Sequence, residues 1–270
     1  MIGVVQAGPR SGYGGSKLAA TVLLIRDGHH GLEVWVQERV NTMPNYPGIT
    51  VFPGGGVDPR DYPPKTWDSG DLWLGPSAIS VARTMGTTKD KAHALVFAAV
   101  RETFEETGTL LAVHGDGTKV SDAAPLHSDR LALESHRLSL TTVLKNNNLK
   151  VDSRLIHPFA RWVGKSERGQ WFDTFSFLAL QPEGQHPDSD NTETDSAGWF
   201  PPRLLLDGWR NGLVRFVIPT WAQLQQLSHY QSADEALADA HNADLEPHIG
   251  DVSDDPRYGE FYSHAPVDRI

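Results

Sequence analysis

The sequence predicts an α+β fold, because this chain of 270 residues contains both strand patterns and helix patterns. Residues 18–26 are largely apolar, and apolar and polar residues alternate along 32–39, as expected for β-strands. Apolar residues recur at helical spacing before Gly108, and short helices are predicted at 203–209 and 219–227. A single domain spanning residues 1–270 is the simplest division of a chain of this length.

A further apolar run, residues 49–52, leads into three consecutive glycines, Gly54, Gly55 and Gly56. Glycines permit positive φ angles and a close approach of the backbone to a ligand, and their N–H groups can face phosphate oxygens. Taken alone, such a run is more often an ordinary turn. In combination with an acidic helix, the three glycines become candidate substrate-binding residues.

The helix before Gly108 carries three carboxylates, Glu102, Glu105 and Glu106, within an arc of roughly 100°. Like charges at this spacing repel one another, so their clustering suggests a bound cation. Carboxylates without cysteine or paired histidines favour Mg²⁺ or Mn²⁺ over zinc. A solvated acidic helix face is the alternative. Four apolar residues point the opposite way and can pack on a sheet: Val96, Phe97, Val100 and Phe104.

The second half of the chain supplies fewer signals. Residues 126–146 show helical periodicity, and residues 170–180 read as a strand. Residues 232–256 contain eight acidic residues and no Lys or Arg, which predicts a solvated or wrapping tail. The prolines and tryptophans of residues 62–90 indicate a lid or a dimer contact without deciding between them, so a homodimer stays open.

Composition limits the classes of partner. A net charge of −10 argues against nucleic acid, although bound metals can still attract a small anionic substrate. The absence of cysteine excludes disulfides, thiolate metal sites and a cysteine nucleophile. No leader and no run of eighteen apolar residues is found, so we expect a cytoplasmic protein without a membrane partner.

Together, the glycines and the acidic helix resemble the signature of the Nudix hydrolases, in which a glycine and an acidic residue precede Arg-Glu-x-x-Glu-Glu-x-Gly. Here 39 residues separate Asp61 from Arg101 where the family has seven, which implies an insert of 32 residues at about 62–93. The resemblance extends from about residue 18 to 227 and implies a mixed β-sheet sandwiched between helices, followed by a C-terminal extension at about 203–270. The matching positions are Gly55, Asp61, Arg101, Glu102, Glu105, Glu106 and Gly108.

The resemblance also implies an activity, which is Mg²⁺- or Mn²⁺-dependent hydrolysis of a diphosphate bond in a nucleotide derivative. Glu102, Glu105 and Glu106 would hold the metal, and Arg101 would orient one of these glutamates. The general base would be Glu105 or a later loop acid, for which Glu193, six residues before a tryptophan, is the match. The candidate catalytic residues are therefore Glu105, Glu193 and Arg101.

Among Nudix proteins, the long insert resembles the branch that includes coenzyme A diphosphatases. Arg39, Gly48 and Asp58 match that branch, whereas Val40 stands where it has serine. Arg39 could contact a phosphate or be an ordinary surface charge. Coenzyme A or a derivative is the expected substrate; ADP-ribose, a nucleotide sugar, a non-catalytic nucleotide sensor and an unrelated acidic scaffold are the alternatives.

Overall fold

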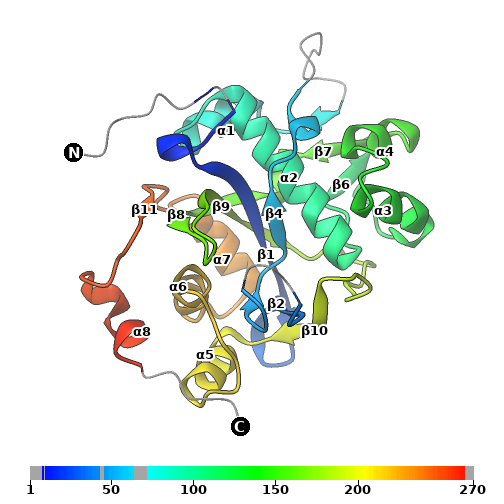
Figure 1. The fold of residues 1–270 in the computed structure, drawn as a ribbon. Coiled ribbons are helices and arrows are strands. Elements are labelled where there is room, and N and C mark those ends of the chain that lie inside the picture. The colour runs from blue at the N-terminus through cyan, green and yellow to red at the C-terminus, as the bar shows by residue number, and fades with distance from the viewer. Residues whose placement is uncertain (1–7, 9, 43–45, 64–71, 265–270) are drawn as a thin grey trace.

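The computed structural model describes residues 8, 10–42, 46–63 and 72–264. Within these ranges eight strands form one large sheet, and β1 pairs parallel with β9 but antiparallel with β2, so the sheet is mixed as predicted (Figure 1). Its main path is β10-β2-β1-β9-β8-β11, with β3 beside β2 and β4 beside β1. The strands are β1 (Lys17–Gly28), β2 (Gly31–Arg39), β3 (Thr50–Val51), β4 (Gly54–Gly56), β8 (His157–Lys165), β9 (Trp171–Leu180), β10 (Thr194–Phe200) and β11 (His248–Ile249).

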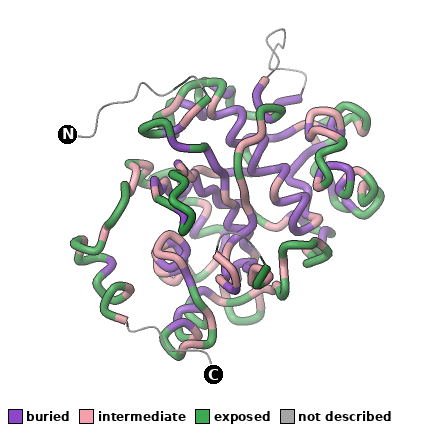
Figure 2. Tube along the Cα trace, in the orientation of Figure 1, coloured by how far each residue is buried: buried purple, intermediate pink, exposed green. Residues whose placement is uncertain are grey.

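One face of the sheet is covered by helix α2 (Lys89–Thr107), which lies against β1 and β4 (Figure 1). The helix begins after Thr88, whose hydroxyl accepts a hydrogen bond from the Lys91 N–H. It ends at Gly108, where φ is 70° and the N–H donates to the Phe104 carbonyl. The predicted apolar face of α2 is buried in the core between the helix and the sheet, and Figure 2 shows most of α2 and β1 coloured as buried.

The opposite face carries the C-terminal helices, which completes the predicted layering of helix, sheet and helix. Apolar side chains of β1 and β2 on this face pack with Trp221 and Leu224 in a second core. Both faces are covered, so β1 is apolar on both sides rather than alternating. These helices are α5 (Pro202–Arg210), α6 (Ile218–Leu227), α7 (Ala233–Ala240) and α8 (Gly259–Ser263).

The insert contributes strand β5 (Trp73–Leu74) and helix α1 (Ala78–Thr84), while residues 64–71 lie outside the described part. The Trp73 ring stacks on His93, with ring centroids 5.5 Å apart, so the insert packs against the first turns of α2. The predicted insert ended at about residue 93, whereas α2 already begins at Lys89, so the last residues of the predicted insert form the start of this helix. β5 also joins a separate three-stranded sheet with β7 (Leu149–Asp152) and β6 (Ala112–His114), which the sequence patterns did not indicate.

The prediction of one helix over residues 126–146 is wrong. The structure has α3 (His127–Glu134) and α4 (Leu140–Asn146), separated by a turn in which His136 has a φ of 56°. The side chain of Ser139 accepts a hydrogen bond from the Thr142 N–H and begins the second helix. The spacing of the leucines continues across this break, which is why periodicity alone misled the prediction.

The acidic tail wraps around the protein, one of the two states predicted for it. Ala233 and Ala236 of α7 are buried against the sheet, and β11 pairs parallel with β8. Among the described helices, none combines the length and apolar character needed to cross a membrane. Short 3-10 helices occur at Tyr13–Gly15, Pro59–Asp61, Ala124–Leu126, Ser153–Leu155 and Pro256–Tyr258.

Candidate active site

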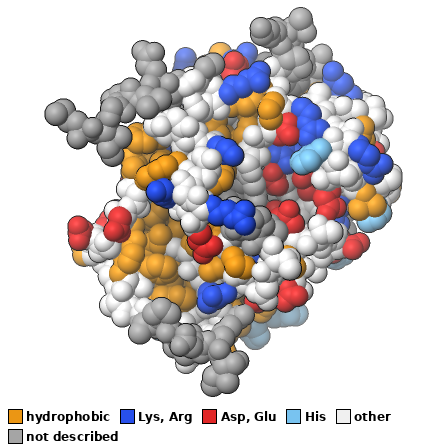
Figure 3. Space-filling view, viewed as in Figure 1, with side chains coloured by type: hydrophobic (Ala, Val, Ile, Leu, Met, Phe, Trp, Pro, Cys, Tyr) orange, Lys and Arg blue, Asp and Glu red, His pale blue; other side chains and the backbone are white. Residues whose placement is uncertain are grey.

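The three glutamates of α2 lie in a partly enclosed cluster and not on a solvated helix face. Glu105 and Glu106 are each only 8% exposed, and the side chain of Glu102 is 13% exposed. Acidic side chains gather over α2 on the molecular surface, with basic side chains around them (Figure 3). The alternative of an ordinary solvated face is therefore wrong for this helix.

The glycine run meets the glutamates directly. A Cβ atom on Gly55 would lie 2.5–2.7 Å from the carboxylate of Glu102, so only glycine permits this approach. The Gly54 N–H donates to Glu106 Oε2 at 3.2 Å. The glycine strand β4 pairs with β1, and the Gly54 N–H is already hydrogen-bonded to Glu106. The glycines therefore help to hold the helix carboxylates in position.

Arg101 joins the two halves of the split signature. Its Nη2 donates to Asp61 Oδ2 at 3.0 Å and to the Gly56 carbonyl at 2.9 Å. Its Nη1 donates to Glu102 Oε1 at 2.7 Å and to Glu105 Oε2 at 3.4 Å. One guanidinium thus fixes the acid that precedes the insert, the glycine strand and two glutamates, although 39 residues of chain lie between Asp61 and Arg101.

The surroundings of the site raise the pKa values of all three glutamates. Burial raises the pKa of Glu105 to about 7, although Arg101 opposes the rise. Burial, followed by the charges of Glu102 and Glu193, raises the pKa of Glu106 well above its usual value. Burial also raises the pKa of Glu102, which Arg101 opposes. Perturbed carboxylates of this kind are typical of functional sites.

The loop acid Glu193 reaches the same cluster from the other side. Its side chain is 50% exposed, and its Oε2 lies 3.8 Å from Nη2 of Arg39. Arg39 is only 18% exposed, so it lines the site and is not an ordinary surface charge. The charges of Arg39 and Glu193 both act on Glu106, so the structure brings these two predicted residues close to the glutamates of α2.

The donor set fits a hard divalent cation. Carboxylate oxygens are the ligands that Mg²⁺ and Mn²⁺ prefer, and a cation would stabilise the ionised glutamates, which burial and then neighbouring negative charges disfavour. Glu105 Oε1 is buried without a hydrogen-bond partner, which leaves one oxygen available. Among the described residues, no group of three or more acidic, histidine or cysteine side chains is arranged so that it could hold a metal ion. Arg101 bonds one oxygen each of Glu102 and Glu105, and Gln37 bonds one oxygen of Glu106.

Sequence reasoning missed Gln37, which donates its side-chain N–H to Glu106 Oε2. Its own Oε1 is buried without a partner, as are Arg39 Nε and Thr194 Oγ1 beside it. Unpartnered buried polar atoms are rare, and three of them, on Gln37, Arg39 and Thr194, lie on the paired strands β2 and β10. The available signal was the position of Gln37 on the core-facing side of β2, two residues after the buried Trp35.

Two neighbouring glycines provide a matched test of the contact between β4 and the glutamates. Gly55→Ala should lower kcat/KM about 100-fold for the diphosphate substrate that the sequence resemblance implies, because the new methyl group would displace the Glu102 carboxylate and small displacements of catalytic groups are costly. Gly56→Ala should stay within about threefold of wild type, because its Cβ would meet no atom within 4 Å. Steady-state kinetics of both variants check this, and equal losses would contradict the geometry.

Stability should depend on pH in a direction set by Glu105. Its folded-state pKa of about 7 exceeds the ordinary 4.5, so the protonated carboxyl stabilises the fold below pH 4.5 and this contribution is lost as the pH rises to 7. The loss corresponds to about 3 kcal/mol for the group alone. Urea unfolding from pH 5 to 8 with a chelator should show the decline, and saturating Mg²⁺ should reduce it. A metal-free protein that gains stability over this range would contradict the prediction.

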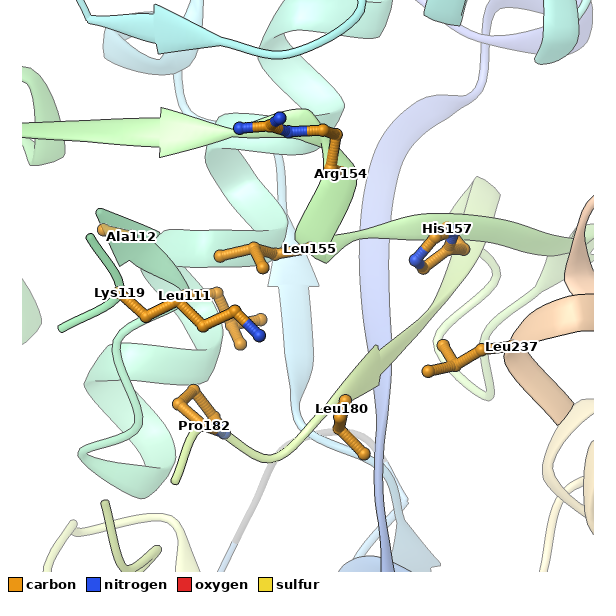
Figure 4. Close-up of a pocket in the computed structure, with 9 residues that line it drawn as sticks. All are labelled: Leu111, Ala112, Lys119, Arg154, Leu155, His157, Leu180, Pro182 and Leu237. Carbon is orange, nitrogen blue, oxygen red and sulfur yellow. The ribbon is translucent and has the colours of Figure 1, made fainter. Parts of the chain in front are cut away.

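A cavity of about 110 Å³ lies elsewhere, between β6, the start of β8, the end of β9 and α7. Lys119 points its amino group into the cavity, whereas Arg154 points away from it (Figure 4). The walls are largely apolar, and none of the site acids lines it. This cavity is therefore separate from the acidic cluster.

Comparisons with known proteins identify relatives of this chain. No family model matches the sequence. The chain is similar to the acyl-coenzyme A diphosphatase NUDT19 of Xenopus laevis, with 21% identity over 234 residues. That match covers 75% of this chain and 61% of the relative, so the chain spans about three fifths of the relative's length.

Similarity to a solved structure is more extensive. The crystal structure of a NUDIX hydrolase from Alicyclobacillus acidocaldarius has 30% sequence identity and a TM-score of 0.67. The match covers 83% of this chain and 96% of that one. With the sheet, the glycine strand and the glutamate helix in place, this chain belongs to the Nudix hydrolase family.

Proposed function

We propose that this Nudix hydrolase cleaves the diphosphate bond of a nucleoside diphosphate derivative, with coenzyme A or one of its derivatives as the preferred substrate. The single observation that carries the proposal is the buried cluster of three glutamates with raised pKa values, held against the glycine strand by Arg101. Such a cluster has no structural benefit of its own, because buried like charges destabilise a fold. The products would be two monophosphates.

Glu102, Glu105 and Glu106 would hold Mg²⁺ or Mn²⁺. When bound there, the cation would supply charge neutralisation for the diphosphate and would lower the pKa of the attacking water. Arg101 would keep Glu102 and Glu105 in position, and Arg39 would contact a phosphate; the bonds of Arg101 to both glutamates and the buried, unpartnered Nε of Arg39 support these roles.

Two carboxylates are placed to accept the proton of the attacking water. Glu105 has a buried, unpartnered Oε1 and a pKa of about 7, close to the operating range of a general base. Glu193 is half exposed and faces Arg39, which suits an acid that approaches the substrate from a loop. The Glu193→Gln and Glu105→Gln variants separate the two roles, because loss of the base should flatten the acid limb of the pH–rate profile.

Preference for coenzyme A rests on similarity to an acyl-coenzyme A diphosphatase and on Arg39, Gly48 and Asp58, which match that branch. ADP-ribose or a nucleotide sugar is the second candidate. A nucleotide sensor without activity is disfavoured, because Glu102, Glu105 and Glu106 are all present and clustered.

A substrate panel tests the proposal. The protein is incubated with Mg²⁺ and coenzyme A, acyl-coenzyme A, ADP-ribose, NADH or a sugar nucleotide, beside Glu105→Gln, and the products are separated by chromatography. We expect 4′-phosphopantetheine and 3′,5′-ADP from coenzyme A and a loss of about 10²–10⁴-fold in the variant. Equal cleavage by both proteins would show that the site is misplaced, and cleavage of no diphosphate would overturn the activity.

A further inference from the structure

The carboxyl end of α2 is bound by the loop that carries Glu193. A helix leaves its last four carbonyls without intrahelical partners. Here Gly108 caps the carbonyl of Phe104, and the other three are taken by side chains or backbone from outside the helix. The three bonds run from Arg130 Nε to the Glu105 carbonyl at 3.0 Å, from Asn191 Nδ2 to the Glu106 carbonyl at 2.7 Å, and from Asp188 N to the Thr107 carbonyl at 2.9 Å.

Asn191 makes the most informative of these contacts because its amide has two partners. Its Nδ2 donates to the backbone carbonyl of Glu106, and its Oδ1 accepts the N–H of Glu193 at 2.9 Å. One side chain therefore bridges the backbones of the helix acid and the loop acid. The Val40 N–H donates to the Glu193 carbonyl at 2.9 Å and ties the far side of the loop to the end of β2.

An ion pair holds the base of the same loop. Arg130 donates from Nη1 and Nη2 to the two carboxylate oxygens of Asp188, at 2.9 and 2.8 Å, while its Nε binds the Glu105 carbonyl. This pair lies over Gly108, where a Cβ would come within 2.8 Å of Arg130 Nη1 and 3.0 Å of Asp188 Oδ2. The signature glycine is thus required both for its φ of 70° and for the space that this pair occupies.

The bridge works against electrostatic repulsion. Glu193 is half exposed, and its negative charge disfavours the ionised forms of Glu102 and Glu106, so repulsion favours movement of the loop away from the helix when those acids are ionised. Arg39 attracts it only weakly at 3.8 Å. The hydrogen bonds of Asn191 oppose that movement whether or not a cation is bound.

We propose that Asn191 is a positioning residue that sets the distance between Glu193 and the helix acids by bridging the backbones of Glu106 and Glu193. The inference rests on the proposed function, since the spacing matters only if both acids serve one reaction. A displacement of about 1 Å in a catalytic group can reduce the rate about 100-fold. Loss of the bridge should therefore act on kcat, because Asn191 acts through the acids rather than on the substrate.

The first experiment measures kinetics of Asn191→Ala and Asn191→Asp. Aspartate keeps the oxygen that accepts the Glu193 N–H but loses the donor to Glu106, so both variants should lose 10–100-fold in kcat with KM within about threefold. Full activity in Asn191→Asp would mean that the bond to the Glu106 carbonyl does not matter for catalysis, and it would overturn the proposal. In a Glu193→Gln background, Asn191→Ala should change kcat by less than threefold, and an undiminished effect there would also overturn it.

The matched control is Asn147→Ala. Asn147 likewise donates its Nδ2 to a carbonyl in the last turn of a helix, that of Val143 in α4 at 2.9 Å. The same Nδ2 also donates to Asp129 Oδ2 at 2.8 Å, so Asn147, like Asn191, links a helix end to a second segment. Its kinetics should stay within twofold of wild type. An equal loss of kcat in Asn147→Ala would mean that the effect of Asn191 is general destabilisation.

Hydrogen exchange of the intact protein gives a readout that needs no substrate. Peptides spanning residues 183–196 should exchange at least fivefold faster in Asn191→Ala than in wild type or in Asn147→Ala. Unchanged exchange would overturn the positioning role even if the enzyme cleaves diphosphates. Faster exchange in a protein that cleaves no diphosphate would instead reject the proposed function and retain the bridge.

Discussion

Glu106→Gln is expected to lower kcat/KM with Mg²⁺ by about 10²–10⁴-fold and, at the same time, to stabilise the metal-free protein. The loss follows from removing one charge of the proposed cation site. The gain follows because burial and the charges of Glu102 and Glu193 penalise the ionised carboxylate. Gln37 and the Gly54 N–H both donate to the same oxygen, Oε2, so the single oxygen of glutamine can keep both bonds.

Three measurements check this opposition of activity and stability. The urea midpoint at pH 7.5 with a chelator should rise in Glu106→Gln, while Mn²⁺ affinity measured by calorimetry should fall at least tenfold. Glu260→Gln is the control, because Arg210 lowers the pKa of Glu260 on the far C-terminal segment and its loss should reduce stability slightly without affecting activity. A Glu106 variant that is less stable and fully active would contradict the assignment.

Arg101→Met should destabilise the protein by about 3–5 kcal/mol, the cost of breaking a buried ion pair from one side. The side chain of Asp61 is 2% exposed, and burial already raises its pKa against the opposing effect of Arg101. Without the guanidinium, that carboxyl must be protonated or remain an uncompensated buried charge. Glu102 and Glu105 would also lose their shared donor, so activity should fall with stability.

Urea unfolding of Arg101→Met is best compared with that of Arg257→Met. Arg257 pairs with Asp255 just as closely, but its side chain is 64% exposed, and such pairs contribute about 0–1 kcal/mol. The double variant Asp61→Asn with Arg101→Met should recover part of the lost stability, because neither charge is then left alone. Equal effects of the Arg101 and Arg257 changes would contradict a central role for the buried network.

The parts of the fold that depend on local pattern could be predicted from the sequence. The strands β1 and β2 follow from apolar runs, and α2 follows from its apolar face and from Gly108, whose left-handed conformation ends the helix. The meeting of Gly55 with Glu102 was also predictable, since both belong to one recognisable signature. Each of these features depends either on residues that are close in the sequence or on positions within one signature.

The parts that depend on tertiary contact could not be predicted. Gln37 and Asn191 touch Glu106 across 69 and 85 residues, and no local pattern records such distances. Arg130 falls within the single helix that was predicted over residues 126–146, and no local pattern indicates its hydrogen bond to the Glu105 carbonyl at the end of α2. The small sheet of β5, β7 and β6 likewise arises from short segments far apart in the chain.

The salt bridge between Arg101 and Asp61 has an evolutionary consequence. This pair holds the two ends of the insert side by side, and His93 is hydrogen-bonded to the Asp61 carbonyl at 3.0 Å. The positions of the site residues therefore do not depend on the length of the insert between Asp61 and Arg101. The entropy of closing a flexible segment grows only logarithmically, by about 0.6 kcal/mol for each doubling of its length. Evolution can therefore lengthen, shorten or repurpose the insert while the arrangement of the site residues stays the same.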